Sequence, residues 1–480
     1  MLNYILSAYI VFAIVLGGLQ LVNRRKALAK ALVALFVLGQ WALTAYALLG
    51  SSTPSSEFFS VDALAKLLTL VVSIISSAAF CHSNGYIVQN EQDKDAKVRA
   101  QSYGAMTILT MALTMAGVSA HLAVTWIFIE ITTLCASALI FYRRTQNSIE
   151  ATWKYVFACS ISLVLVYVGI LLASISMGED SASGLSFAAL GQAADKLDDF
   201  WLKLSFIFIF VGYTAKMGLV PMFTAGIDAK DAAPAPAAAV LSSIVMNAGF
   251  VGFYRFYAVV QHTAAARWAM MVVLVTGVVS VFVAAVYLVK VHNVKRLFAY
   301  SSVEHIGVVA IGVACGGVGL YAAILHLVLH SFAKSAIMMH VGNLFRVFGT
   351  KQMNRMGRYI DKTHPGAAIL ILGLLCITAM PPSGLFITEL MIFKALISAH
   401  LWVVLAILAV LLCTIVWAMS RDTFSIIFLP AEEPLLRKEA SQPFPWTEAA
   451  WQFALLGLSI WWGLWTPDFI SSLVSAAAAI

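Results

Sequence analysis

Runs of apolar residues long enough to cross a bilayer follow one another along almost the whole of this chain. A membrane-spanning helix needs about 20 predominantly apolar residues. Because the chain is 61% hydrophobic and only 11% charged, a water-soluble fold could not hide its apolar surface. We therefore expect an all-α polytopic membrane protein with about 14 transmembrane helices. The expected spans are 2–22, 27–49, 61–82, 101–119, 121–142, 153–175, 202–225, 235–258, 267–289, 298–316, 319–347, 367–398, 401–420 and 448–475.

Basic residues collect in alternate loops between these spans. Residues 23–26 and 349–362 are rich in Lys and Arg, whereas 50–60 carries one glutamate and 176–200 is mostly acidic. Because basic loops stay in the cytoplasm, this alternation predicts that both termini lie outside. The same rule accounts for the net charge of +7 without a nucleic-acid partner. The expected location is a bacterial or archaeal cytoplasmic membrane.

Two of the expected spans contain a proline break, at 218–221 and at 380–384. Proline removes a backbone donor, and irregular backbone at membrane depth persists only where protein or a watery cavity satisfies it. The two broken helices lie an odd number of helices apart, so they run in opposite directions. Paired broken helices of opposite sense indicate inverted repeats. The expected units are 1–100 with three helices, repeats over 101–260 and 261–420, and 421–480 with a cytoplasmic loop and the last helix.

Several ionisable residues fall inside the apolar spans, where a charge is costly and is by default a functional candidate. Lys216 lies just before the first proline break, and Glu130 lies in the middle of the fifth span. With no water to solvate it, the carboxylate of Glu130 should bind a proton or pair with a cation, and Lys216 is the candidate partner. A static pair is the alternative to a switchable one.

The eleventh span carries His326, His330 and Lys334 at a spacing of four residues. This spacing places all three side chains along one helix face, and histidine can relay a proton near neutral pH. Two histidines four residues apart could also bind a metal ion, but no acidic third ligand is adjacent, so we expect no metal. His340, further along the same span, is expected to serve packing or an interface.

Glu389 follows the second proline break and is the inverted counterpart of Lys216. Lys394 lies closer to the outer face and is expected to extend its amine to the interface. Glu304 and His305 fall near the start of the tenth span, where a glutamate could simply favour the positive end of the helix dipole. Glu130, Lys216, the face of the eleventh span and Glu389 form a series suited to lateral proton transfer.

The six cysteines are scattered through apolar segments, and none forms a CxxC pair. This pattern argues against iron–sulfur clusters, zinc and disulfides, and favours cysteines that pack as small apolar residues. The sequence also contains no flavin, nucleotide or nickel motif. We therefore expect no cofactor and no catalytic residue in this chain, so that any redox chemistry comes from partners.

Four segments resemble the antiporter-like membrane subunits of respiratory complex I and its relatives: 292–307, 330–344, 349–358 and 380–393. The Ser-Val-Glu-His sequence and the glutamate of the twelfth span are most similar to hydrogenase-4 component F. The resemblance implies a proton-translocating subunit with 14 helices and two inverted five-helix repeats. It also implies the set of proton-translocating residues. They are Glu130, Lys216, His292, His326, His330, Lys334 and Glu389.

The chain departs from the family pattern at two places. Many relatives carry a lysine in the eighth helix where this chain has Asn247. The usual HxWLPDAH sequence after the seventh helix is reduced to 222–232, which leaves Asp228, with Lys230 in place of the last histidine. The resemblance therefore predicts a link across Asn247 made by water or another residue, and it puts the cytoplasmic intake in doubt.

Four functions remain open at this stage. The first is a proton-pumping subunit of a redox complex of the membrane-bound hydrogenase, formate hydrogenlyase or complex I kind. Its partners would be other membrane subunits, a peripheral electron-transfer arm, lipid and protons. The second is an Mrp-type cation/proton antiporter subunit, in which sodium could replace protons. The third is the ion-conducting membrane partner of an inorganic-carbon uptake system. The fourth is a scaffold whose charges are merely paired, which the cost of intramembrane charges disfavours.

Overall fold

The computed structural model describes residues 2–50, 55–89, 96–178, 184–433 and 446–479. All named elements in these ranges are helices, as predicted, and strand-like pairing is limited to isolated bridges. Parts of four expected loops lie outside the described residues: 51–54, 90–95, 179–183 and 434–445.

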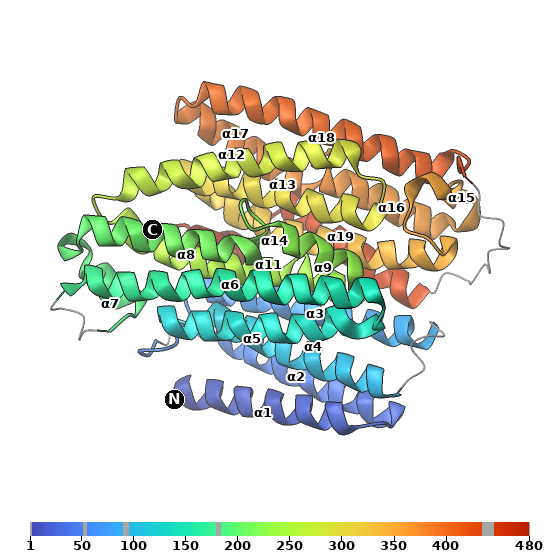
Figure 1. Ribbon diagram of the computed structural model, residues 1–480, viewed down its shortest axis with the longest axis horizontal. Helices are drawn as coiled ribbons and strands as arrows, with labels where there is room; N and C mark the ends of the chain where they lie inside the picture. The colour runs from blue at the N-terminus through green and yellow to red at the C-terminus, as the bar shows by residue number, and fades with distance from the viewer. Residues whose placement is uncertain (1, 51–54, 90–95, 179–183, 434–445, 480) are drawn as a thin grey trace.

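The long helices lie side by side with their axes roughly along one direction, from α1 at one edge to α18 at the other (Figure 1). The first ten are α1 Leu2–Val22, α2 Lys26–Leu49, α3 Ala63–Gln89, α4 Ala96–Val118, α5 Leu122–Ile140, α6 Gln146–Ser176, α7 Phe187–Gln192, α8 Asp199–Met217, α9 Thr224–Ala232 and α10 Ala235–Leu241. The others are α11 Ile244–Gln261, α12 Ala266–Lys290, α13 Val294–Cys315, α14 Gly317–Phe348, α15 Tyr359–Lys362, α16 His364–Ile377, α17 Gly384–Ser398, α18 Trp402–Phe428, α19 Trp446–Leu464 and α20 Asp468–Ala477.

Eleven helical segments of the described chain are long and apolar enough to cross a membrane, so the protein is polytopic. The remaining three expected spans also fall on helices. They lie on α4, on α16 with α17, and on α19 with α20. The helices α16 and α17 have only 14 and 15 residues because the break between them divides the span. The total of about 14 spans stays a prediction.

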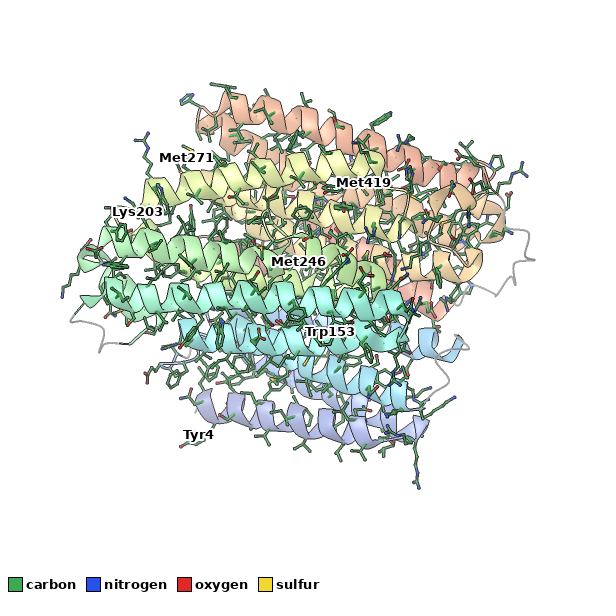
Figure 2. All side chains as sticks on the ribbon, in the orientation of Figure 1. Tyr4, Trp153, Lys203, Met246, Met271 and Met419 are labelled. Carbon is green, nitrogen blue, oxygen red and sulfur yellow. The ribbon has the colours of Figure 1, made fainter. Side chains whose placement is uncertain are left out.

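The helices differ sharply in how much of their surface faces other helices. The spans of α10–α11, α13 and α14 are buried along their whole apolar windows, whereas only 28% of the α18 window is buried. Figure 2 places Met246 of α11 near the centre of the bundle in this view and Tyr4 of α1 at its edge. A helix that is buried on every side can present polar groups only to protein, so α11, α13 and α14 form the interior of the bundle.

Both expected breaks are present. The helix α8 ends at Met217, where Gly218 adopts a φ of 84° that favours glycine, and α9 begins only at Thr224. The helix α16 ends at Ile377, and α17 begins at Gly384. Each break therefore places irregular backbone beside one of the expected charged residues, Lys216 before the first break and Glu389 after the second.

Candidate functional site

Lys216 lies in the last turn of α8 with 3% of its surface exposed. Its ammonium nitrogen Nζ donates a hydrogen bond to the Tyr155 hydroxyl at 3.0 Å and lies 5.0 Å from the centre of the Tyr155 ring. The opposite side of Lys216 is closed by α11 at Gly249, where an added Cβ would lie 2.7 Å from the lysine Cβ. Close contact with α11 and one hydroxyl acceptor thus hold this lysine in the interior.

Glu130 forms no ion pair with Lys216, so the prediction that the two residues contact each other is wrong. Its carboxylate is partly exposed and accepts a hydrogen bond of 3.4 Å from Thr133 on the same helix. The reason is the order of the helices, because α6 packs against both α5 and α8 and places Tyr155 beside the lysine. Glu130 nonetheless lies within electrostatic range of Lys216, so each charge still influences the other.

A small cavity of about 20 Å³ adjoins Lys216. Tyr155, Lys216 and Lys230 line it together with α11 residues that include Met246. A volume of this size holds about one water molecule. The lysine therefore borders a space in which a proton could pass through water, rather than a fully packed apolar wall.

A larger polar cavity of about 240 Å³ lies next to the small one along α6 and α9. Asp228 and Asp231 line it and bind three cations: Arg296 lies 2.6 Å from Asp228, and Lys351 lies 2.8 Å from Asp231. Lys154, whose amine lies 3.7 Å from Asp228 and 2.6 Å from Glu150, also lines the cavity, as does Glu150. This mixed set of charges makes a polar approach to the turn of α9 that carries Lys230.

Asp231 lies between the spanning helices, at the end of α9. Burial alone would raise the pKa of its carboxyl, but the nearby cations, Lys351 foremost, outweigh burial and hold the pKa below its ordinary value. Asp231 therefore stays ionised and fastens the loop at Lys351 to α9.

Three histidines meet in the interior between α13 and α14. Nδ1 of His305 lies 3.1 Å from Nε2 of His326, and Nδ1 of His326 lies 2.8 Å from the Thr388 hydroxyl on α17. The ring centre of His330 lies 4.8 Å from that of His305. All three rings are at least 97% buried, since their exposed fractions are 0%, 0% and 3%. The structure thus extends the expected His326 and His330 face by a histidine from a second helix.

Two buried carboxyls border this histidine group. Glu304 on α13 is 2% exposed and lies 3.8 Å from His305, and Glu389 on α17 is 9% exposed. Oε2 of Glu304 and Oε1 of Glu389 have no hydrogen-bond partner among the described residues. An ionisable oxygen that is buried without a partner favours exchange of a proton over a static role.

Glu304 and His305 do not open a helix, contrary to expectation. The helix α13 begins at Val294, so both residues lie about three turns inside it and face α14. The helix begins before the expected start at 298, because Lys295 and Arg296 interrupt the apolar run in the sequence. Lys295 is nevertheless buried, and its amine donates a hydrogen bond to the Ala233 carbonyl at 2.5 Å. The apolar residues around the Ser-Val-Glu-His sequence were the feature of the sequence that could have indicated burial of Glu304 and His305.

Lys334 lies one turn beyond His330 on α14 and is completely buried. Its amine donates to the Phe298 carbonyl at 2.6 Å and to the Ser301 hydroxyl, both on α13. Glu304 lies within electrostatic range of this amine. The lysine is therefore solvated by oxygens of α13, and its charge is felt by a carboxyl next to the histidines.

The donor atoms of His305, His326 and Glu389 all lie within 4.8 Å of one another, a spacing that a metal ion could also use. Both ring nitrogens of His326 are already engaged, one by His305 and one by Thr388. A neutral imidazole can accept at one nitrogen and donate at the other, so the observed geometry is that of a hydrogen-bonded relay.

His292 is the expected site residue that the structure leaves outside the interior. It is exposed in the loop before α13, where its backbone carbonyl accepts a hydrogen bond from Met353 at 2.9 Å. His292 therefore lies where two loops meet and is not among the buried ionisable residues of the interior. Lys394 is exposed on α17, as expected of a lysine that reaches the interface.

Asn247 lies in the part of the interior between Lys216 and Lys334. Its amide nitrogen donates to the Ser331 hydroxyl of α14 at 2.9 Å, and one turn away the hydroxyls of Ser243 and Ser335 lie 2.9 Å apart. The interior between Lys216 and Lys334 is thus polar, but Asn247 itself does not titrate.

The structure contains a second cluster of buried charged residues, which was not predicted from the sequence. Arg346 of α14 makes a close ion pair with Glu448 of α19, and His82 of α3 lies 3.8 Å from the same carboxylate. His340, expected to serve packing, bonds Gln452 of α19 at 2.9 Å. These contacts tie α19 and α3 to one end of α14.

The helical fold and its buried row of carboxyls, lysines and histidines define a multi-pass membrane protein of the antiporter-like class. The chain belongs to the NADH:quinone oxidoreductase/Mrp antiporter transmembrane family, whose model matches residues 119–415.

Similar sequences and structures are consistent with this family. The chain is 31% identical over 355 residues to a hydrogenase-4 component F homolog of Methylacidiphilum infernorum, covering 72% of this chain and 74% of the relative. Its fold is similar to a chain of the Mrp complex from Dietzia sp. DQ12-45-1b, with a TM-score of 0.86, 17% identity, and 100% and 97% of the two chains covered. It is also similar to a chain of the membrane-bound sulfane sulfur reductase, an archaeal respiratory membrane complex, with a TM-score of 0.83, 20% identity, and 99% and 97% covered.

Proposed function

We propose that this chain is a proton-translocating membrane subunit of a multi-subunit redox complex. The observation that carries the proposal is the row of buried ionisable side chains that spans the interior from Lys216 to Glu389. Such charges are expensive in a membrane unless they are used, and Lys334, Glu304 and Glu389 influence one another electrostatically.

The proposed path begins at the cavity lined by Asp228 and Asp231, which would open to the cytoplasm, and continues to Lys216. Lys334 receives the proton next and passes it to the histidine group. Glu389, whose Oε1 has no partner, releases it outward. Each transfer breaks one N–H or O–H bond and forms another on the neighbouring group, and no electrons move within the chain.

Redox chemistry in partner subunits would drive this path by changing the charge near Glu130. A change there alters the proton affinity of Lys216, because the two groups interact electrostatically. The chain's kinship with a hydrogenase-4 component F homolog favours a complex of membrane subunits with a peripheral electron-transfer arm. The sequence offers no CxxC pair for an iron–sulfur cluster of its own.

The chain is further proposed to sit in the cytoplasmic membrane with both termini outside, and to contain inverted repeats over 101–260 and 261–420. The breaks beside Lys216 and Glu389 support this proposal, because each of the two repeats would contain one of them. This arrangement pairs an intake site in the first repeat with a release site in the second.

Proton release measured together with electron transfer tests the proposal. Inside-out vesicles that contain the intact complex would be energised with its own electron donor, and acidification would be compared for the parent chain and Glu389→Gln. Gln keeps the shape of Glu but cannot carry a proton. We expect normal assembly and loss of acidification; unchanged acidification per electron would overturn the proposed path.

A sodium-exchanging Mrp-type subunit is the second candidate, because the matching family includes Mrp antiporters. Purifying the complex and identifying its subunits separates the two, since a redox arm supports the first and a set of antiporter subunits the second. A soluble zinc protein among the partners would instead support inorganic-carbon uptake. Sodium-dependent transport without an electron donor would favour the antiporter.

A further inference from the structure

Lys230 is a buried lysine to which the path above gives no role. It lies on α9 with 4% of its surface exposed. Its amine makes one hydrogen bond with the described residues, to the sulfur of Met246 at 3.3 Å. A thioether is a weak acceptor, so this contact offsets little of the cost of burying an amine. A purely structural lysine would be expected to have a carboxylate or several carbonyl oxygens.

The surroundings of Lys230 connect it to the first half of the site. The cavity of about 20 Å³ that borders Lys216 is also lined by Lys230, and it has room for about one water molecule. The two lysines therefore line one small cavity. A single water between them could accept a proton from one amine and donate a proton to the other.

Lys230 also reaches the second half of the site. Its charge lies within electrostatic range of both Lys334 and His330. Its hydrogen-bond partner Met246 precedes Asn247, the residue that bonds α14 at Ser331. Lys230 thus contacts the segment of α11 that carries Asn247 and interacts with Lys334 and His330 on α14.

We propose that Lys230 is the proton-carrying link between Lys216 and Lys334, replacing the titratable group that is missing at Asn247. This inference rests on the proposed function. The Nζ–H bond of protonated Lys216 breaks and an Nζ–H bond forms on neutral Lys230. Lys230 then gives a proton toward Lys334, again with no change in electrons. A lysine suits this step because its ammonium loses its proton readily when it is buried.

Three substitutions in the intact complex separate a relay from a fixed charge. Lys230→Met keeps the length of the side chain without a titratable group. Lys230→Arg keeps a positive charge that is never given up in a protein, and Lys230→His provides a titratable group. Proton release per electron would be measured in inside-out vesicles, and co-purification of the other subunits would report assembly. Lys394→Met, which removes an exposed lysine of α17, is the matched control.

We expect Lys230→Met and Lys230→Arg to lower proton release per electron at least about tenfold, as for loss of a proton-transfer group. Lys230→His should retain a measurable share, and the control should match the parent. Parent-like release with Lys230→Met or Lys230→Arg would overturn the relay, and so would a Lys230→His variant as inactive as Lys230→Met. If the Lys230→Met complex fails to assemble, the comparison of proton release by Lys230→Arg and Lys230→His decides between a relay and a fixed charge.

Lys216→Met in the same series distinguishes failure of this inference from failure of the proposed function. If Lys216→Met abolishes proton release while Lys230→Met does not, the proposed function stands and the relay falls. If both variants release protons like the parent, the proposed function itself falls.

Discussion

The amine nitrogen of Lys216 lies 3.0 Å from the hydroxyl oxygen of Tyr155 on α6, the helix that packs against both α8 and the helix of Glu130. The lysine bonds this tyrosine and interacts with the Glu130 carboxylate only electrostatically, with no ion pair between them. A hydroxyl can accept from an ammonium and donate to water, so Tyr155 can stabilise Lys216 in its protonated state. The pair makes Tyr155 a positioning residue of the first half of the site.

Removal of this hydroxyl should weaken proton transfer without harming the fold. Tyr155→Phe deletes one hydrogen bond to a charged group, worth about 1.5–3 kcal/mol, so we expect proton release per electron to fall about tenfold or more. The measurement is acidification of inside-out vesicles at matched electron-transfer rates. Tyr167→Phe, on the partly exposed face of the same helix, should leave release unchanged. Equal release by the two variants would show that the Tyr155 hydroxyl is not used.

Gly249 is expected to control the place of Lys216. A Cβ at this position would lie 2.7 Å from the lysine Cβ and 2.9 Å from the Met217 amide nitrogen, so α8 and α11 would have to separate. We expect Gly249→Ala to lower the free energy of unfolding by about 1–3 kcal/mol and to reduce proton release. Thermal unfolding of the purified complex and vesicle acidification measure the two effects.

Gly457→Ala on α19 is the matched control for Gly249→Ala. No atom lies within 4 Å of its added Cβ, and alanine favours a helix over glycine by about 0.5–1 kcal/mol. The control should be neutral or slightly stabilising. If Gly249→Ala behaves like Gly457→Ala, the close contact of α8 and α11 is not needed to hold Lys216.

Asp231 should stabilise the protein in a pH-dependent way. Its pKa is held below the ordinary value in the fold, so its stabilisation is fully present above the unfolded pKa of about 4. The stabilisation disappears as the pH falls through the lower folded pKa. We expect Asp231→Asn to cost about 1–3 kcal/mol at pH 7 and the difference from the parent to shrink below about pH 4.

Thermal unfolding of both chains from pH 7 down to pH 3 checks this prediction. A difference between Asp231→Asn and the parent that widened as the pH fell would contradict the sign of the effect. No difference at pH 7 would mean that the ion pair with Lys351 contributes nothing to stability.

The ion pair of Arg346 and Glu448 should contribute strongly to stability because both groups are buried, with 8% and 1% of their side chains exposed. Glu448→Gln removes the charge of one partner, and we expect a loss of about 3 kcal/mol in thermal unfolding. Glu433→Gln breaks an exposed pair with Arg355 and should cost less than about 1 kcal/mol. Similar losses from the two variants would argue against a structural tie between α14 and α19.

The apolar runs predicted the all-α polytopic fold because the bilayer imposes length and hydrophobicity on each span. The proline breaks beside Lys216 and Glu389 were also foreseeable, since proline and glycine act locally on the chain. The burial of Lys334 followed from its place in a long apolar span. These features depend on neighbours in the sequence, which a single sequence displays directly.

The contacts between helices were less accessible. The pairing expected between Glu130 and Lys216 failed because a sequence does not reveal that α6 lies between α5 and α8. His305 was underestimated for a similar reason, since its partner His326 is on another helix. Lys230 was noted from the sequence only as the replacement for a family histidine in a connecting segment, whereas its side chain lines the cavity beside Lys216.

The central claim is that protons cross the interior of this chain on its buried side chains, starting with Lys216. The most direct test is Lys216→Met in inside-out vesicles that contain the intact complex, with electron transfer and acidification recorded together. Methionine preserves the apolar stem of lysine without a titratable group. The account predicts an assembled complex that transfers electrons but releases no protons through this subunit. An unchanged number of protons released per electron would contradict it.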